Sequence, residues 1–456
     1  MPIAFTSSRA RLSSRRVFRH PAQVIVFAFA LAVLIGTGLL MLPVAQVGSG
    51  GAPLLTALFT STSAVCVTGL VTVDTPTYWS GFGQVVILGL IQVGGFGIMT
   101  LASLVGLLLS RRMGLRTRLT AAAETKSIGM GDVRTVLVGV AKVSLLFETA
   151  TATLLTGRFL IGYDEPFGRA LYHGVFHAVS AFNNAGFALY SDSLMGFATD
   201  PWICLPIAVA VIFGGLGFPV ILELRRHLRR PRQWSLHTRL TVGTSAVLLG
   251  LGTLFVTASE WSNPGTLGAF DTPGRLLAGF FQAVMPRTAG FNSVDYSQMR
   301  EGTLLGTDAL MFIGGGSAGT AGGIKVTTFV LLMFVIVAEV RGEKHVHAAD
   351  RRIGERVQRQ ALTVALLSIG MIAVATLVLL EITEFTTGQV LFETVSAFAT
   401  VGLSTGITPD LPGGGQVVLV VLMFMGRLGP ITLVSALALR ERQLRYTLPE
   451  GRPLIG

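Results

Sequence analysis

A pattern of eleven residues occurs four times along the chain, and it limits the possible folds more than any other feature. Each copy begins with a phenylalanine and ends with a glycine ten positions later. The copies are FTSTSAVCVTG (59–69), FHAVSAFNNAG (176–186), FFQAVMPRTAG (280–290) and FETVSAFATVG (392–402). Their glycines are 117, 104 and 112 residues apart. Similarity at a long, nearly constant interval is typical of a fold built from repeated units.

A second glycine motif follows each copy by 24 to 28 residues. It reads GGFG (94–97), GGLG (214–217), GGGS (314–317) and GRLG (426–429). Close packing of small residues between membrane helices explains many scattered glycines. It does not explain why a loop rich in Asn, Thr and Gly recurs at one register in four quarters of the chain. The two motifs predict a unit of span, short re-entrant segment and second span.

The composition places these units in a membrane. Hydrophobic residues make up 51% of the 456 residues and charged residues only 13%, against roughly 25% charged in soluble domains. With about 20 apolar residues needed per crossing, eight spans are predicted. They cover 23–43, 82–109, 135–160, 202–224, 238–258, 304–340, 360–382 and 416–439. The first apolar run is longer than that of a signal peptide, so we expect it to be retained.

Loop charges predict the orientation of the chain. Basic clusters occur before the first span and at 111–118, 225–232, 341–359 and 440–445. The alternate loops carry Asp74, Asp192, Asp295, Glu301 and Asp410. Positively charged loops stay in the cytoplasm, so both termini are expected there. The net charge of +11 is therefore explained by topology, and no nucleic-acid partner is expected.

These features together predict an all-α integral membrane fold with eight transmembrane helices around one pore. The four tandem repeats are expected at 23–110, 111–225, 226–341 and 342–440. A cytoplasmic N-terminal segment (1–22) and a cytoplasmic tail (441–456) flank them.

The short segments have the chemistry of a cation filter. A short helix directs its partially negative C-terminus at the centre of the pore, and the extended residues after it can replace the water around a cation with carbonyl oxygens. Glycine permits the backbone angles that this requires. The predicted filter residues are Val67, Thr68, Gly69, Asn184, Ala185, Gly186, Thr288, Ala289, Gly290, Thr400, Val401 and Gly402. No carboxylate lies among them, which favours a large monovalent cation over calcium or magnesium.

An acidic residue follows each filter glycine on the predicted outer side. These residues are Asp74, Asp192, Asp295 and Asp410. They could concentrate cations at the mouth of the pore. They could equally serve only to end the loops, and the sequence leaves both interpretations open.

A gate is predicted below the filter. GGGSAGTAGG (314–323) holds six glycines, each unfavourable in a helix by roughly 1 kcal/mol relative to Ala, so a broken helix with a flexible loop is expected. Arg427 lies deep in an apolar span and is a functional candidate by default. It is expected to face the pore axis, repel cations and bond to loop carbonyls, although a structural salt bridge stays possible. The gate residues are Gly314, Gly315, Gly316, Ser317, Gly319, Thr320, Gly322, Gly323, Lys325 and Arg427.

Other charged residues and other functions are less well supported. Lys325 is expected to snorkel or face the cytoplasm, and Lys142, Glu148 and Glu381 to make polar contacts between helices. No nucleophile–base pair, phosphate-binding loop or metal-ligand spacing is present, so no enzyme is expected. A secondary transporter of another monovalent cation or small solute is the alternative. Such transporters often have inverted repeats, whereas four parallel repeats favour a pore.

The chain resembles the Trk/Ktr/HKT superfamily of potassium transporters, and within it the membrane subunit of bacterial Ktr systems (the KtrB type). The resemblance covers nearly the whole chain. It is carried by VTGLVTVDT, HAVSAFNNAGF, SNPGTLG, FQAVMPRTAGFNS, MREGT, GGGSAGTAGGIK and MGRLGPIT. Trk-type relatives usually carry two further N-terminal helices, and this chain starts at the first repeat, which favours the Ktr branch.

The resemblance implies uptake of K+, often stimulated by Na+, across the bacterial cytoplasmic membrane. It implies one filter glycine per repeat and an intramembrane gate loop at 314–323, with Arg427 beside it. It further implies a homodimer in the lipid bilayer, with one pore per protomer. A cytoplasmic ring of RCK-type subunits (KtrA-like) would regulate it, and the nucleotide would bind to that partner chain and not to this one.

Overall fold

The computed structural model describes residues 21–112 and 133–429 of the chain. The predicted N-terminal segment up to residue 20, the basic cluster from residue 113 onward and the tail at 441–456 lie outside the described residues. The same holds for the last ten residues of the predicted eighth span. The expected boundaries of the four repeats therefore stay predictions.

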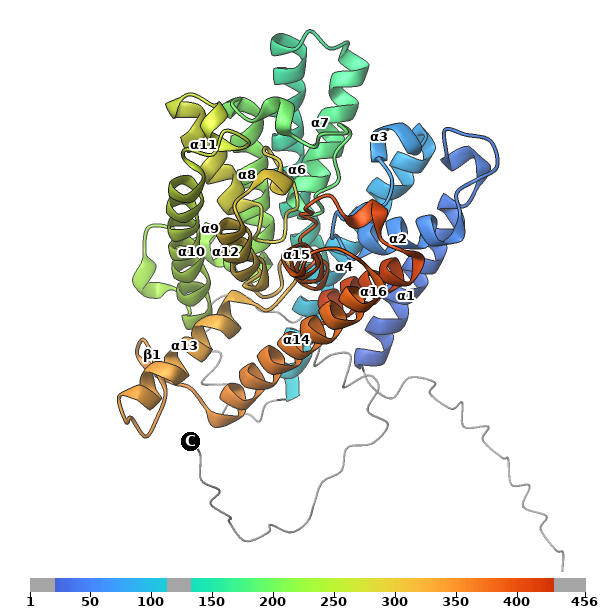
Figure 1. Cartoon of the computed structure of the whole chain (residues 1–456). Helices are drawn as coiled ribbons and strands as arrows, with labels where there is room; N and C mark the ends of the chain where they lie inside the picture. The colour runs from blue at the N-terminus through green and yellow to red at the C-terminus, as the bar shows by residue number, and fades with distance from the viewer. Residues whose placement is uncertain (1–20, 113–132, 430–456) are drawn as a thin grey trace, which may run out of the picture.

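The described chain is mostly helical (Figure 1). Its α-helices are α1 (Pro21–Leu40), α2 (Leu54–Val65), α3 (Thr75–Tyr78), α4 (Gly81–Arg112), α6 (Val133–Gly162), α7 (Phe167–Phe182), α8 (Pro201–Leu216), α9 (Phe218–His227), α10 (Leu236–Glu260), α11 (Thr272–Val284), α12 (Glu301–Phe312), α13 (Val326–Val340), α14 (Glu355–Ile382), α15 (Thr387–Ala399) and α16 (Gly413–Leu428). The 3-10 helices are η1 (Pro43–Ala45), η2 (Met195–Phe197), η3 (Pro231–Gln233), η4 (Leu267–Ala269), η5 (Tyr296–Gln298) and η6 (Thr408–Asp410). Two strands, β1 (His347–Ala348) and β2 (Arg351–Arg352), form an antiparallel hairpin.

Each copy of the repeated pattern begins in a short helix and ends in the loop that follows it. The four short helices are α2, α7, α11 and α15, each of 12 to 16 residues. α2 packs against α1 and α4, α7 against α6 and α8, and α15 against α14 and α16. α11 packs against α10 and against α8 of the preceding repeat. Side-chain caps fix the starts of two of them. Asp271 accepts a hydrogen bond from Gly274 N at the start of α11, and Thr386 forms a capping box with Gln389 at the start of α15.

The phenylalanine that opens each copy explains how the short helices are held. Phe59, Phe176 and Phe392 are completely buried, and Phe280 is partly buried against the main core. An aromatic ring anchors its helix because it fills a large volume in a closely packed interior. The position is therefore a packing requirement that all four repeats share.

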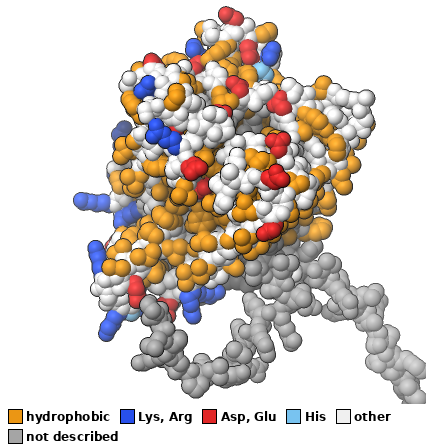
Figure 2. Space-filling view, in the orientation of Figure 1, with side chains coloured by type: hydrophobic (Ala, Val, Ile, Leu, Met, Phe, Trp, Pro, Cys, Tyr) orange, Lys and Arg blue, Asp and Glu red, His pale blue; other side chains and the backbone are white. Residues whose placement is uncertain are grey.

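Five of the described helices are long and apolar enough to cross a membrane, namely α1, α4, α6, α10 and α14. Their outward faces carry exposed apolar side chains such as Leu145 and Leu254, and Figure 2 shows hydrophobic side chains over much of the visible surface. Such a surface suits hydrocarbon better than water. A sixth crossing is added if α8 and α9 are counted together.

The prediction of one continuous span at 202–224 is wrong. The helix breaks at Gly217, and α9 turns away from α8 by 103°. Gly217 has a φ of 95°, and a Cβ there would overlap the carbonyl oxygen of Ser317. The close approach of that distant segment, together with the left-handed backbone, ends the helix. The predicted span at 304–340 is likewise two helices, α12 and α13, separated by an irregular segment, as the glycine run indicates.

Candidate functional site: a ring of four glycines

The four pattern glycines come together in space, although more than a hundred residues separate each from the next. An ideal Cβ built on Gly69 would lie 3.1 Å from the Cα of Gly186, and one built on Gly186 would lie 2.9 Å from the Cα of Gly290. The corresponding distances are 3.2 Å from Gly290 to Gly402 and 3.0 Å from Gly402 to Gly69. The contacts close in chain order, and we call these four residues the glycine ring.

Backbone carbonyls lie at the same ring. A Cβ on each glycine would meet the carbonyl oxygen of the residue that precedes the neighbouring glycine. The four oxygens belong to Thr68, Ala185, Ala289 and Val401. The glycines themselves have φ values of 93°, 70°, 76° and 93°. No other residue type fits, because both the backbone angles and the neighbouring oxygens exclude a Cβ.

The residue two positions before each glycine is also left-handed, which the sequence analysis missed. The φ values are 56° for Val67, 58° for Asn184, 69° for Thr288 and 51° for Thr400. A β-branched residue in this region is a genuine outlier, and each such residue stores about 1–3 kcal/mol of strain. Asn alone among the four tolerates this conformation readily. Strain of this kind is concentrated at functional sites.

The backbone N–H groups of the ring glycines do not all have the same hydrogen-bond acceptor. Gly69 N donates to Ser63 Oγ at 3.0 Å, and Gly402 N donates to Ser396 Oγ at 3.1 Å. The equivalent serine of the second copy, Ser180, donates instead to the carbonyl of Phe187 at 2.8 Å. The third copy has Val284 at this position, so no hydroxyl is present there.

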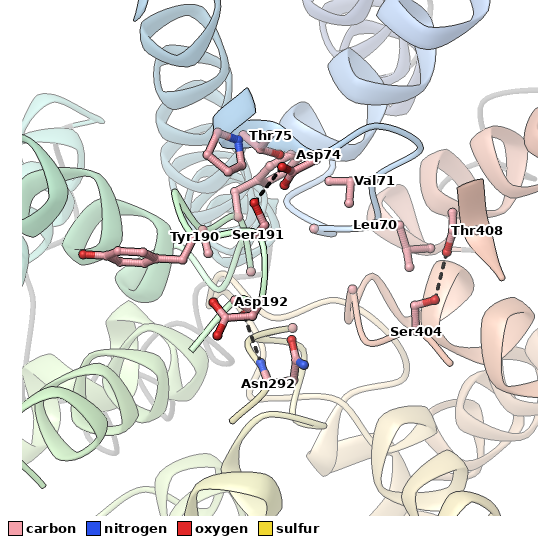
Figure 3. A pocket seen from close by; sticks show the side chains of 18 of the residues that line it. Leu70, Val71, Asp74, Thr75, Tyr190, Ser191, Asp192, Asn292, Ser404 and Thr408 are labelled. Carbon is pink, nitrogen blue, oxygen red and sulfur yellow. Dashed lines mark hydrogen bonds between the residues drawn. The ribbon is translucent and has the colours of Figure 1, made fainter. Parts of the chain in front are cut away.

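A pocket of about 240 Å³ opens on one side of the ring, and all four repeats line it (Figure 3). Asp74 and Asp192 belong to its lining, whereas Asp295 and Asp410 do not. Asp74 accepts hydrogen bonds from Ser191 Oγ at 2.7 Å and thereby joins the first two repeats. Asp295 accepts from Ser297 N and caps η5. The four acidic residues therefore differ, and only Asp74 and Asp192 line the pocket.

One residue that lines this pocket, Tyr190, forms hydrogen bonds within a small polar cluster. Because the pocket lies opposite the cationic side of the ring, we call it the outer pocket. The Tyr190 hydroxyl lies 2.9 Å from His173 Nδ1 and donates to Glu165 Oε1 at 3.3 Å. Burial, and then the negative charge of Glu165, raise the pKa of Tyr190. The phenol of Tyr190 therefore stays neutral and adds no negative charge to the lining of the pocket.

An irregular segment between α12 and α13, residues 313–325, lies on the other side of the ring, and we call it the inner segment. It contacts the residues that precede the ring glycines, since a Cβ on Gly322 would overlap Thr400 Oγ1. Its backbone bonds to the end of α8: Gly316 N donates to the carbonyl of Gly215 at 2.7 Å, and Thr320 N donates to that of Gly214 at 3.1 Å. The expected break in the helix is thus present, and hydrogen bonds hold the broken part.

Three cationic side chains donate to carbonyls of the inner segment. Arg427 is buried and donates to the carbonyl of Thr320, and at 3.3 Å to that of Gly94. Lys325 Nζ donates to the carbonyl of Ala321 at 2.6 Å. The side chain was expected to snorkel or to face the cytoplasm, and here it folds back onto its own loop.

The third cation, Arg287, was not singled out from the sequence. It donates to Ser245 Oγ at 3.0 Å and to the carbonyl of Gly314 at 3.4 Å. A signal was available, because Arg287 and Glu393 are the only Asp, Glu, Lys or Arg residues in the four copies. Within the described chain, none of the three cations forms an ion pair with a carboxylate. Positive charge is thus concentrated beneath the ring.

The weaker candidates divide into two groups. Glu148 is buried and accepts hydrogen bonds from Gln92 Nε2 at 3.1 Å and Asn183 Nδ2 at 3.3 Å, so it joins two long helices to the end of α7. Lys142 and Glu381 are exposed on α6 and α14. In the part of the chain that the structure describes, no group of three or more His, Cys, Asp and Glu residues could hold a metal ion.

Comparisons with known proteins agree on one family. The family model described as TrkH, cation transport protein, matches residues 3–444. The Ktr system potassium uptake protein B of Bacillus subtilis (strain 168) is 42% identical over 96% of this chain and 97% of its own length. The protein of the same name from Vibrio alginolyticus is 37% identical over 95% and 94%.

Two further matches extend this result. The potassium/sodium uptake protein NtpJ of Enterococcus hirae is 34% identical over 96% of this chain and 97% of its own. The crystal structure of the potassium transporter TrkH from Vibrio parahaemolyticus covers 94% of this chain and 87% of that chain, with a TM-score of 0.75 at 18% identity. The likeness to the crystal structure is one of fold.

Proposed function

Because this chain belongs to the TrkH family of cation transport proteins, we propose that it is a multi-pass membrane protein that takes up potassium through the glycine ring. The observation that carries the proposal is the closed ring itself. Four carbonyl oxygens from four repeats lie beside four glycines that admit no side chain. The proposed filter residues are those predicted from the sequence: Val67, Thr68, Gly69, Asn184, Ala185, Gly186, Thr288, Ala289, Gly290, Thr400, Val401 and Gly402.

The chemistry of the ring favours a monovalent cation that loses its water easily. The oxygens at the ring are neutral carbonyls, which can replace the hydration shell of potassium without binding it too tightly to leave. Asp74 and Asp192 in the outer pocket would raise the local concentration of cations. The membrane potential would then drive entry with about 2.3 kcal/mol per charge for each 100 mV.

The inner segment is the proposed gate. Arg427, Lys325 and Arg287 all donate to its carbonyls, and an unpaired positive charge under the ring repels a cation that leaves the filter. Movement of the segment would remove both the obstruction and the charge. The proposed gate residues are the sequence-predicted set from Gly314 to Lys325 together with Arg427.

The finer architecture is also part of the proposal. Eight crossings in four repeats would require that α8 with α9, and α12 with α13, each cross as a broken pair, and that α16 continue beyond residue 429. Broken helices at membrane depth are tolerated where protein buries them or where they line a water-filled path. Both termini would lie in the cytoplasm, and the protein would reside in the bacterial cytoplasmic membrane.

Regulation and assembly are proposed from the relatives. The printed name Ktr system, shared by the relatives from Bacillus and Vibrio, indicates several components, and we propose a homodimer that binds a cytoplasmic RCK-type ring carrying the nucleotide. The name of NtpJ includes sodium, which supports sodium as an activating or second transported ion.

Uptake of rubidium by Gly290→Ser tests the proposed filter. The serine side chain would overlap the carbonyl of Val401, so potassium affinity and selectivity over sodium should fall in a potassium-transport-deficient cell. Gly302→Ser is the matched control, since a Cβ on that glycine of α12 meets nothing within 4 Å. Unchanged affinity and selectivity in Gly290→Ser would remove the ring from the transport path. If sodium or an organic solute were carried in preference to rubidium, the secondary-transporter alternative would hold.

Deletion of residues 314–323 tests the gate. The flux of rubidium into proteoliposomes should rise, because the obstruction is removed and Arg427, Lys325 and Arg287 lose the carbonyls that hold them beneath the ring. Arg427→Ala tests the same point without shortening the chain and should change the flux at equal expression. Wild-type flux in Arg427→Ala, together with equal or lower flux in a folded deletion variant, would contradict the gate.

A further inference from the structure

The side chain of Asn184 leaves the glycine ring and reaches the inner segment. Its Oδ1 accepts a hydrogen bond from Thr320 Oγ1 at 2.9 Å, and both residues are 1% exposed. Gly214 makes room for this contact, since a Cβ there would lie 2.9 Å from the same Oδ1. Three parts of the chain therefore combine to place one amide against one hydroxyl.

Thr320 is the point where the inner segment is held most completely. Its N–H donates to the carbonyl of Gly214 at 3.1 Å, and its own carbonyl accepts from Arg427. Its hydroxyl also lies 3.3 Å from the carbonyl of Phe182. Every polar group of Thr320 has a partner, so the inner segment cannot move away from the ring without breaking the bond to Asn184.

Asn184 also reaches the neighbouring filter loop. Its Nδ2 donates to the carbonyl of Arg287 at 3.4 Å, one residue before the left-handed Thr288. The backbone of Asn184 is itself left-handed, and the next residue, Ala185, supplies one of the carbonyls at the ring. The orientation of this one amide thus affects ring positions in two repeats.

The other three repeats lack this link. Val67 has no polar atom in its side chain, and the hydroxyls of Thr288 and Thr400 have no hydrogen-bond partner in the described structure. Among the described residues, a side-chain hydrogen bond between this filter position and the inner segment is therefore a property of the second repeat. The four repeats are therefore not equivalent at this filter position.

We infer that Thr320 is a specificity-determining positioning residue, which stays bonded to Asn184 when the rest of the inner segment moves and so keeps the ring able to discriminate potassium from sodium. This inference rests on the proposed function, because it assumes that the ring is the filter and the inner segment the gate. Loss of the hydroxyl frees the amide, and the carbonyl of Ala185 can then approach the smaller sodium ion.

Rubidium uptake into proteoliposomes of the purified full chain, with sodium as competitor, tests the inference. Thr320→Val keeps the shape and removes the hydroxyl, so the preference for rubidium over sodium should fall about fivefold, as expected for one buried hydrogen bond. Thr320→Ser should restore the preference. A Thr320→Val protein with wild-type preference, or a Thr320→Ser protein that stays as impaired as Thr320→Val, overturns the inference.

A matched control and a double variant make the test specific. Thr307→Val is the same change at a buried threonine of α12 whose hydroxyl bonds only within its helix, and it should leave the preference unchanged. Asn184→Gly removes the amide and fits the φ of 58°. In that background Thr320→Val should cause no further loss, whereas additive losses overturn the link.

The two levels of failure can be separated. If Gly290→Ser lowers the preference and Thr320→Val does not, the ring is the filter and only the link is wrong. If Gly290→Ser has no effect on affinity or preference, the proposed function itself fails.

Discussion

The loop that carries Gly290 and the loop that carries Gly402 share a backbone and differ in how they are supported. Both have a left-handed threonine two residues before the glycine. In the fourth repeat Ser396 accepts from Gly402 N, and the carboxyl of Glu393 accepts from Ser404 and Thr408.

The third repeat uses other residues for the same purpose. Val284 replaces the serine, and Gly290 N donates only to the carbonyl of Met285 at 3.4 Å. Behind the loop, the amide of Gln282 lies 2.6 Å from the Tyr296 hydroxyl and 3.1 Å from Ser293 Oγ. The comparison teaches that the repeat requires the backbone conformation, while the side chains that hold it can differ.

If the backbone is the shared requirement, Gly290→Ala and Gly402→Ala should be equally harmful. Each places a Cβ on a neighbouring carbonyl and forces an L residue to a positive φ, which costs about 1–2 kcal/mol from the backbone alone. Rubidium uptake should fall about tenfold or more in both. Gly388→Ala, at a position with nothing within 4 Å, is the control. If either alanine variant keeps wild-type rubidium uptake, the third and fourth repeats do not share the same backbone requirement.

The hydrogen bonds that hold the two loops should contribute differently to the free energy of unfolding. Thr408→Val removes a hydroxyl that donates to Glu393 Oε2 at 2.9 Å, and Tyr296→Phe removes one that contacts Gln282. Hydrogen bonds to charged groups contribute about 1.5–3 kcal/mol and those between neutral groups about 0.5–1.5 kcal/mol. At a pH high enough to ionise the buried carboxyl of Glu393, the free energy of unfolding in detergent should therefore fall more for Thr408→Val. Equal losses would indicate that the carboxyl of Glu393 is neutral.

The serine that supports the glycine amide should matter only where it is present. Ser396→Ala removes the acceptor for Gly402 N, a loss of about 1 kcal/mol, and rubidium affinity should fall about fivefold. Val284→Thr introduces a hydroxyl of similar shape at the matching position of the third repeat and should leave the affinity unchanged. Titration of rubidium uptake compares the two variants. An unaltered affinity in Ser396→Ala would show that the hydrogen bond from Gly402 N to Ser396 has no role in ion binding.

The smallest expected effect concerns strain at the left-handed positions. Asn accepts this conformation more readily than Thr, so Thr288→Asn and Thr400→Asn should each raise the free energy of unfolding by about 0.5–1 kcal/mol. Asn184→Thr should lower it by more, since its φ of 58° then falls on a β-branched residue and the hydrogen bonds of the amide to Thr320 and Arg287 are lost. Thermal unfolding of the detergent-solubilised proteins measures all three. If the free energy of unfolding rises for only one of Thr288→Asn and Thr400→Asn, the backbones of the third and fourth filter loops are not equivalent.

The sequence by itself determined the repeated unit and the register of its loops. Each glycine comes ten positions after its anchoring phenylalanine, and this spacing can be read from the sequence because helix packing and backbone conformation impose it locally. The same holds for the break between α12 and α13, where six glycines in ten residues disfavour a helix. Membership of a family of cation transport proteins follows from the same stretches.

Tertiary structure alone decided which partners these residues meet. The bend at Gly217 depends on Ser317, a hundred residues away. Asn184 was predicted as one wall of the filter, but its side chain bonds to Thr320, 136 residues later. Lys325 folds back onto carbonyls instead of reaching the surface. Hydrogen bonds between distant segments leave no periodic trace in the sequence, because any donor of suitable size can satisfy a buried acceptor once the fold has brought it there.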